Sequence, residues 1–292
     1  MTDVVCDRGD MADRVVLWHN GGLVDANTAA LAWSDHGITV GDGVFETIEL
    51  RGGAPFALVR HLDRLERSCA GLRFAPPDRS ELHRAVDEVS AVWGIAGGRL
   101  RITITTGDGP MGSERGRGPL TLLVSATAMT VATEPTDVVT VAFTRNERGA
   151  LAGLKTTSYG ENVVALQQAR DSGASEAIFA NTVGELCEGT GSNVFVAISG
   201  RLLTPPLSSG CLAGVTRALL LEALARAGVP AFEEPIPMSD WPTVDEAFLV
   251  STGRHVQPIV HIDGDEVPGT PGPLTQAAAR VWRDAYDDAV EP

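Results

Sequence analysis

The stretch LAGLKTTSY at residues 151–159 contains the only lysine of this 292-residue chain, Lys155, and arginine accounts for the other 22 of its 23 basic residues. An arginine stays protonated in the cell, but a lysine amine can lose its proton in suitable surroundings and attack a carbonyl. The segment does not fit the phosphate loop of nucleotide-binding enzymes, because Leu154 stands where that motif needs a glycine. Composition alone leaves two interpretations of Lys155 open, a catalytic nucleophile and a chance surface residue.

Three glycine-containing motifs downstream of the lysine indicate a ligand site. Residues 184–195, GELCEGTGSNVF, place Glu188 before a glycine-rich turn that lets a ligand approach the backbone closely. Residues 212–217, LAGVTR, open a predicted helix at Gly214, and the first N–H groups of a helix form a natural phosphate seat. Residues 251–253, STG, supply two hydroxyls at the end of a predicted strand. Taken singly, each motif also has an ordinary structural explanation, as a solvated turn, a helix start or a strand end.

The first half of the chain alternates short strands and helices. Period-two alternation predicts a strand over residues 43–50, with Glu46 as an acid on a largely apolar face. Apolar residues spaced by three and four predict an amphipathic helix over residues 61–72. A glycine-rich loop at residues 107–118 is a candidate to line the site. The other predicted elements are strands at 14–18, 100–106, 120–126, 138–143, 176–180, 193–198 and 247–250, a helix after Pro77, and helices at 162–171 and 215–227.

The length of the chain suits two domains better than one. Residues 128–137 lose clear periodicity and are rich in threonine, alanine, glutamate and proline. We therefore predict an N-terminal α/β domain at residues 1–128, a connector at 129–137 and a second domain at 138–292.

The charge balance argues against polyanionic partners. With 38 acidic and 23 basic residues, the net charge of -15 repels nucleic acid and anionic lipid surfaces. We see neither a membrane-length apolar run nor an apolar leader core, and therefore expect a cytoplasmic protein without nucleic acid or membrane partners. The four cysteines do not have metal-ligand or disulfide-scaffold spacing, which favours reduced structural thiols at Cys6, Cys69, Cys187 and Cys211.

Together, these motifs resemble the class IV aminotransferases, pyridoxal phosphate (PLP) enzymes of fold type IV. That family includes branched-chain aminotransferases, D-amino-acid aminotransferases and aminodeoxychorismate lyases. The resemblance covers nearly the whole chain and implies an α+β or α/β fold of two mixed domains with the cofactor site between them, in a homodimer. The matching segments are DHG at 35–37, GDGVFE at 41–46, HLDRL at 61–65, the Lys155 segment, 188–195, 214–217, and 251–252 ahead of 256–258.

The resemblance also implies a role for each site residue. Lys155 forms the Schiff base to PLP and moves the Cα proton of the substrate. Glu188 bonds the pyridine nitrogen, because a negative charge there keeps the nitrogen protonated and makes the ring an electron sink. Arg64 binds the phosphate. Further cofactor contacts are implied for Asn193, Val215, Thr216, Ser251, Thr252 and Tyr159.

The substrate side of the site is less completely matched. Phe45 is expected to line the substrate pocket. D-amino-acid aminotransferases of the usual type bind the substrate carboxylate with an Arg-x-His motif in the loop after the third strand. The corresponding loop here, residues 107–115, contains no histidine and therefore lacks this motif. A substrate carboxylate therefore needs another cation. The candidates are Arg115, Arg117, Arg148 and Arg254.

Two reactions share this machinery. A transaminase passes an amino group from an amino acid to PLP and then to a keto acid, whereas an aminodeoxychorismate lyase releases pyruvate and p-aminobenzoate. Thr47 resembles the lyases and Glu46 the aminotransferases. A non-catalytic PLP-binding protein is disfavoured, because the nucleophile, the acid and the phosphate contacts are all present. We predict a transaminase of relaxed specificity that accepts D-amino acids, with the lyase as the alternative.

Overall fold

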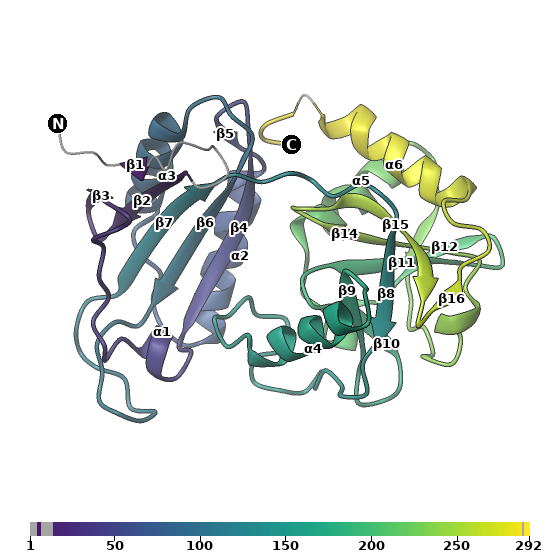
Figure 1. The fold of residues 1–292 in the computed structure, drawn as a ribbon, viewed down its shortest axis with the longest axis horizontal. Helices are drawn as coiled ribbons and strands as arrows, with labels where there is room; N and C mark the ends of the chain where they lie inside the picture. Colours follow the sequence, from purple (N-terminus) through teal and green to yellow (C-terminus); the bar gives the residue numbers. More distant parts are fainter. Residues whose placement is uncertain (1–4, 7–13, 288) are drawn as a thin grey trace. The chain divides into compact units, whose positions relative to one another are not determined.

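The computed structural model describes residues 5–6, 14–287 and 289–292, and the chain divides into two compact units (Figure 1). The first unit comprises residues 1–130, 154–159 and 290–292, and the second comprises residues 131–153 and 160–289. The mixed architecture of helices and sheets expected from the sequence is confirmed.

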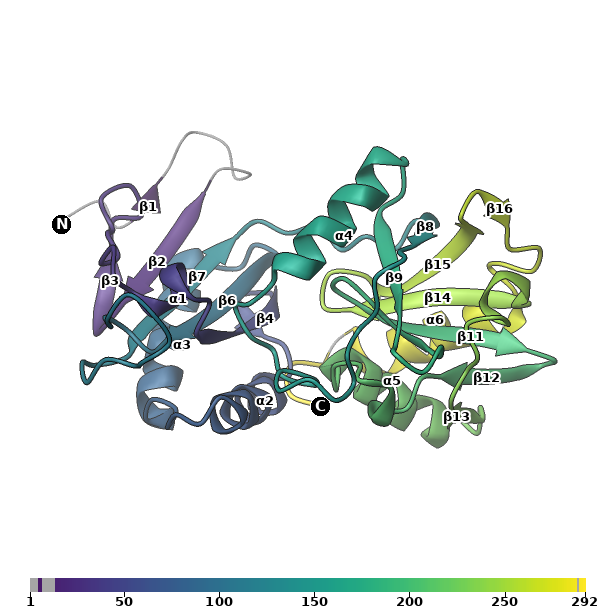
Figure 2. The same cartoon turned by 90° about the horizontal axis from the view of Figure 1, so that it is seen from below.

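The first unit is a sheet covered by helices. Its strand order is β1–β2–β7–β6–β4–β5, with β3 paired to β2. Helices α2 and α3 contact the strands from one face of this sheet (Figure 2). The strands are β1 (Val5–Cys6), β2 (Val15–His19), β3 (Gly22–Val24), β4 (Gly43–Arg51), β5 (Ala54–Pro55), β6 (Gly98–Thr105) and β7 (Thr121–Thr127). The helices are α1 (His36–Thr39), α2 (Leu58–Gly71) and α3 (Arg79–Trp93).

Alternation along β4 assigns its two faces. Val44, Ile48 and Leu50 are buried in one apolar core with Leu62 and Leu65 of α2. Phe45, Thr47 and Glu49 point to the other face, as the two-residue period requires. The strand predicted for residues 43–50 is therefore confirmed, and so is its apolar face.

The segment around Lys155 packs with the first unit, whereas the sequence boundary assigned it to the second domain. Strand β5 pairs only with the C-terminal end of β4, which leaves the N-terminal half of β4 with an open edge. The lysine segment fills that edge. Phe45 N–H donates to Lys155 O at 3.0 Å, and Thr157 N–H donates to Gly43 O at 2.8 Å. These backbone hydrogen bonds satisfy groups that would otherwise be unpaired at a sheet edge.

The second unit contains a mixed sheet with the strand order β10–β9–β8–β15–β14–β11–β12–β13, and β16 pairs with β15. The strands are β8 (Thr136–Thr140), β9 (Glu176–Ala180), β10 (Leu186–Gly189), β11 (Asn193–Ile198), β12 (Arg201–Thr204), β13 (Ala231–Glu233), β14 (Glu246–Ser251), β15 (His255–Ile262) and β16 (Asp265–Glu266). The helices are α4 (Gly160–Asp171), α5 (Val215–Arg226), α6 (Pro273–Tyr286) and the short 3-10 helices η2 (Leu207–Ser209) and η3 (Trp241–Thr243).

Several elements differ from the sequence predictions. The sequence analysis did not anticipate β15 or α6, and the strand predicted at residues 138–143 lies at Thr136–Thr140. Cys69, Cys187 and Cys211 are buried free thiols, as expected, while the side chain of Cys6 lies outside the described part of the chain. None of the helices formed by the described residues is long and apolar enough to cross a membrane.

Candidate active site

The first unit gathers four predicted or newly found site residues around one aromatic ring. We call Lys155, Phe45, Tyr159 and Arg101 the lysine cluster. Lys155 Nζ lies 4.4 Å from the centroid of the Phe45 ring, and Tyr159 meets that ring edge-on at 5.2 Å between centroids. The Arg101 guanidinium carbon lies 3.9 Å from the same centroid. Sequence reasoning identified three of these residues and missed Arg101.

Arg101 is a partly buried cation beside the lysine. Its Nε donates to Thr103 Oγ1 at 3.0 Å, and within the described part of the chain no carboxylate forms an ion pair with it. Burial lowers the pKa of Arg101, with a smaller contribution from Arg99. A guanidinium nevertheless stays charged at neutral pH, so this group is suited to accept an anion. The register of β4 and β6 pairs Arg101 with Thr47, which makes Arg101 a diagonal neighbour of Phe45.

Behind the lysine cluster, Glu46 is completely buried and paired twice. Arg64 donates to it through Nε at 2.8 Å and Nη2 at 2.6 Å, and His61 Nδ1 lies 2.7 Å from Glu46 Oε2. Burial alone would raise the pKa of Glu46, but Arg64 and His61 outweigh it and hold that pKa far below its usual range. Burial lowers the pKa of His61, to which Lys155 adds repulsion. Glu46 therefore fixes the orientation of Arg64, the predicted phosphate ligand.

We expect this pairing to make stability depend on pH. Folding depresses the pKa of Glu46. The contribution of Glu46 to the free energy of unfolding is therefore complete above the ordinary pKa of 4.5, and it is lost progressively as the pH falls below that value. Glu46→Gln should lower the unfolding free energy at pH 7 by about 3 kcal/mol, because a buried Arg64 loses its partner. Urea unfolding at several pH values measures this, and the half-exposed control Glu81→Gln should cost under about 1 kcal/mol. Equal losses in both variants would contradict it.

In the second unit, Glu188 is held by a backbone amide and a cation. Leu212 N–H donates to Glu188 Oε2 at 2.8 Å, and Arg145 Nε lies 3.4 Å from Oε1. The Arg145 guanidinium also stacks over Phe179, with its carbon 4.1 Å from the ring centroid. Arg145 was not identified from the sequence. Its buried Nε has no hydrogen-bond acceptor among the described residues, so the carboxylate and the cation interact mainly through charge.

Asn193 links Glu188 to the predicted phosphate-binding helix start after Gly214. Its side chain donates to Leu212 O at 2.9 Å, so Leu212 is held at its N–H by Glu188 and at its carbonyl by Asn193. A Cβ on Gly214 would lie 2.0 Å from Asn193 Oδ1, which explains the need for glycine there.

Helix α5 begins directly after Gly214, and no side chain in the described part of the protein caps it. The N–H groups of Val215 and Thr216 in its first turn therefore have no acceptor within the helix. The uncapped start of this helix fits the phosphate group of PLP, and the fixed carboxylate of Glu188 fits its pyridine nitrogen. Ser251 ends β14 and Thr252 opens the turn that follows, so both lie at a strand end as predicted.

Two of the four candidate arginines for the substrate carboxylate, Arg115 and Arg254, already contact protein groups. Arg254 donates through Nη2 to Ser175 O at 3.0 Å, forms a hydrogen bond with Gln257, and lies 3.5 Å from Glu176. Arg115 is paired with Asp42 at 2.6 Å. Their roles in substrate binding stay predictions.

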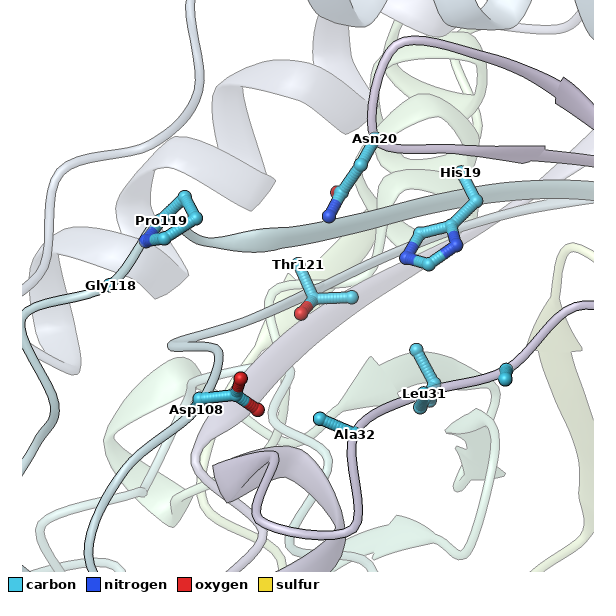
Figure 3. A pocket seen from close by; sticks show the side chains of 9 residues that line it. His19, Asn20, Leu31, Ala32, Asp108, Gly118, Pro119 and Thr121 are labelled. Atoms are coloured by element: carbon cyan, nitrogen blue, oxygen red, sulfur yellow. The ribbon is translucent and has the colours of Figure 1, made fainter.

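The first unit contains a cavity of about 210 Å³, and Figure 3 shows the side chains that line it. His19, Asn20, Asp108 and Thr121 contribute its polar lining, and none of its lining residues belongs to the lysine cluster.

This chain is similar to known proteins over most of its length. The family profile described as "Amino-transferase class IV" matches residues 43–262. A putative branched-chain-amino-acid aminotransferase of Methanocaldococcus jannaschii is 32% identical over 253 residues, 85% of this chain and 88% of that protein. A D-alanine aminotransferase of Bacillus licheniformis is 31% identical over 265 residues, 88% of this chain and 92% of that protein. The PLP-bound form of a hypothetical aminotransferase from Mycobacterium tuberculosis superimposes with a TM-score of 0.84 at 25% identity, covering 94% of this chain and all of that one.

Proposed function

Because this chain belongs to the class IV aminotransferase family, whose members depend on PLP, we propose that it is a transaminase that passes the amino group of an amino acid to a keto acid. We further propose that D-amino acids serve as donors, as the name of the Bacillus licheniformis relative suggests. The observation that carries the proposal is the lysine cluster, in which the only lysine of the chain lies against an aromatic ring and beside a cation.

Each residue has a defined task in this reaction. When bound, PLP acts as an electron sink that stabilises the negative charge left at Cα. Lys155 would hold the cofactor covalently and, once the substrate amine has released it, would take the Cα proton on its Nζ and deliver that proton to C4′ of the cofactor. Glu188, kept in place by Arg145 and Leu212 N–H, supplies the negative charge for the pyridine nitrogen.

The phosphate group is assigned to a second set of donors. Arg64, oriented by Glu46, supplies a guanidinium, and the first turn of α5 supplies N–H groups. Asn193 holds the chain before that helix, while Ser251, Thr252 and Tyr159 stay predicted cofactor contacts. The homodimer and the cytoplasmic location also stay predictions.

We assign the substrate carboxylate to Arg101. Within the described residues this guanidinium has no carboxylate partner, and it lies over the same ring as the Lys155 amine. The lysine that takes the Cα proton and a cation for the carboxylate are thus both next to Phe45. Arg115 and Arg254, by contrast, would have to give up protein partners to bind a substrate.

Absorbance spectroscopy tests the proposed reaction. The PLP-loaded protein should show a band of the Lys155-linked cofactor, which D-alanine converts to the pyridoxamine form and a keto acid restores. L-leucine as a parallel donor reports the preferred enantiomer. If neither amino acid changes the band while aminodeoxychorismate yields pyruvate and p-aminobenzoate, the protein is a lyase and the transaminase proposal is wrong.

Arg101→Gln should raise KM for the amino acid by about 10- to 100-fold, because a charge-assisted hydrogen bond to a carboxylate contributes about 1.5–3 kcal/mol. Turnover of a primary amine that lacks a carboxylate should change little. The matched control is Arg99→Gln, which changes an exposed arginine two residues earlier in the same strand. Steady-state kinetics with both substrates measure the effect, and an equal loss with the amine would rule out a carboxylate contact at Arg101.

A further inference from the structure

An ion pair between Asp42 and Arg115 joins the 107–118 loop to the turn before β4. Arg115 Nε donates to Asp42 Oδ2 at 2.6 Å, and its Nη2 donates to Oδ1 at 2.7 Å. The same guanidinium donates to Arg73 O at 3.1 Å and to Leu72 O at 2.6 Å, beyond the end of α2. Four of its N–H···O contacts are therefore made within the protein, which leaves little capacity for a second carboxylate.

Asp42 is fixed from the other side as well. Thr106 Oγ1 donates to Asp42 Oδ2 at 2.7 Å, and Thr106 N–H donates to the main-chain carbonyl of Asp42 at 3.2 Å. Burial alone would raise the pKa of Asp42, but the hydrogen bonds from Arg115 and Thr106 outweigh it and hold that pKa below its usual value. The carboxylate is therefore ionised at neutral pH and the pair with Arg115 is complete.

The turn that contains Asp42 also contacts the lysine segment on both sides of this residue. Gly41 O accepts hydrogen bonds from Thr157 Oγ1 at 3.0 Å and Ser158 Oγ at 2.9 Å, and Gly43 O accepts one from Thr157 N–H. A Cβ on Gly41 would lie 2.7 Å from Ser158 Oγ, and φ of +68° at this residue favours glycine. The turn is thus pressed closely against the segment that carries Lys155.

We propose that Asp42 and Arg115 act together as positioning residues: the pair holds the 41–43 turn, and through it the Lys155 segment, while anchoring the 107–118 loop. Arg115 then acts through Asp42 and does not bind the substrate carboxylate. This inference rests on the proposed function only where transamination is used as a readout.

A double-mutant cycle separates positioning from direct binding. In the PLP-loaded enzyme, Arg115→Gln and Asp42→Asn should each lower kcat/KM about tenfold, and the double variant should lose no more than either one, because both changes break the same contact. If Arg115 bound the substrate, Asp42→Asn would keep or raise kcat/KM while Arg115→Gln lowered it. That pattern, or a double variant that is about 100-fold impaired, would overturn the proposal.

Trypsin cleavage after Arg117, an exposed residue of the loop, gives a readout that does not depend on activity. Both variants should be cleaved there several-fold faster than the wild type, because the loop has lost its anchor. The matched control is Glu114→Gln, an exposed change in the same loop that leaves the pair intact. Unchanged cleavage in Asp42→Asn would refute the anchoring role, and it would do so even if the wild type showed no transamination.

Discussion

Lys155→Ala should abolish the absorbance band of the covalently bound cofactor and lower transaminase turnover by about 10³-fold or more. Two tasks disappear with the amine, because it both holds PLP and moves the Cα proton, and general acid–base catalysis alone contributes about 10²- to 10⁴-fold. No other lysine in the sequence can substitute for it. Turnover and the visible spectrum of the purified variant measure both effects.

Lys155→Arg is the informative control for this variant. It retains the positive charge near the Phe45 ring but cannot form the covalent link, because a guanidinium is not a nucleophile at cellular pH. We expect it to be as inactive as Lys155→Ala. Activity in Lys155→Arg at the wild-type level would show that Lys155 contributes charge rather than chemistry.

Glu188→Gln should lower kcat by roughly 10³-fold. A unit charge about 4 Å away in a partly screened site is worth about 4 kcal/mol, so losing it weakens the electron sink by a comparable amount. The variant keeps the size of the side chain and leaves an oxygen to accept the Leu212 N–H bond. Single-turnover absorbance changes with an amino donor measure the step directly.

The control for Glu188 is a change of charge elsewhere in the same unit. Glu266→Gln removes one negative charge from an exposed strand residue and should leave kcat within about twofold, since distant surface charges are screened. If Glu188→Gln behaved like Glu266→Gln, the assignment of Glu188 to the pyridine nitrogen would be wrong.

The local features of the fold could be predicted from the sequence where pattern and turn chemistry agreed. The strand at 43–50 and the helix at 215–227 were found because their apolar periods and flanking glycines point to the same structure. That the segment around Lys155 groups with the first unit could not be predicted from the sequence, because its pairing with the open edge of β4 is a long-range contact that no local pattern reveals.

Only those site residues that belong to recognisable sequence motifs could be predicted from the sequence. Lys155 and Glu188 stand in recognisable segments, whereas Arg101 and Arg145 do not. Arg99 and Arg101 lie on the same face of β6, so their alternation along the strand does not distinguish them. The cross-strand register and the ring contact are what place the Arg101 guanidinium over Phe45. Arg115, by contrast, was a candidate from the sequence because it stands in a glycine-rich loop. The structure pairs its guanidinium with Asp42, a contact between distant segments that the loop sequence does not reveal.

Borohydride reduction of the PLP-loaded protein, followed by tryptic digestion and mass spectrometry, tests the central claim most directly. The reduced link should be found on the peptide of residues 149–170, with Lys155 modified and therefore resistant to trypsin. Protein that retains PLP but carries no added mass on this peptide would contradict the account, because Lys155 would then not be the residue that bonds the cofactor.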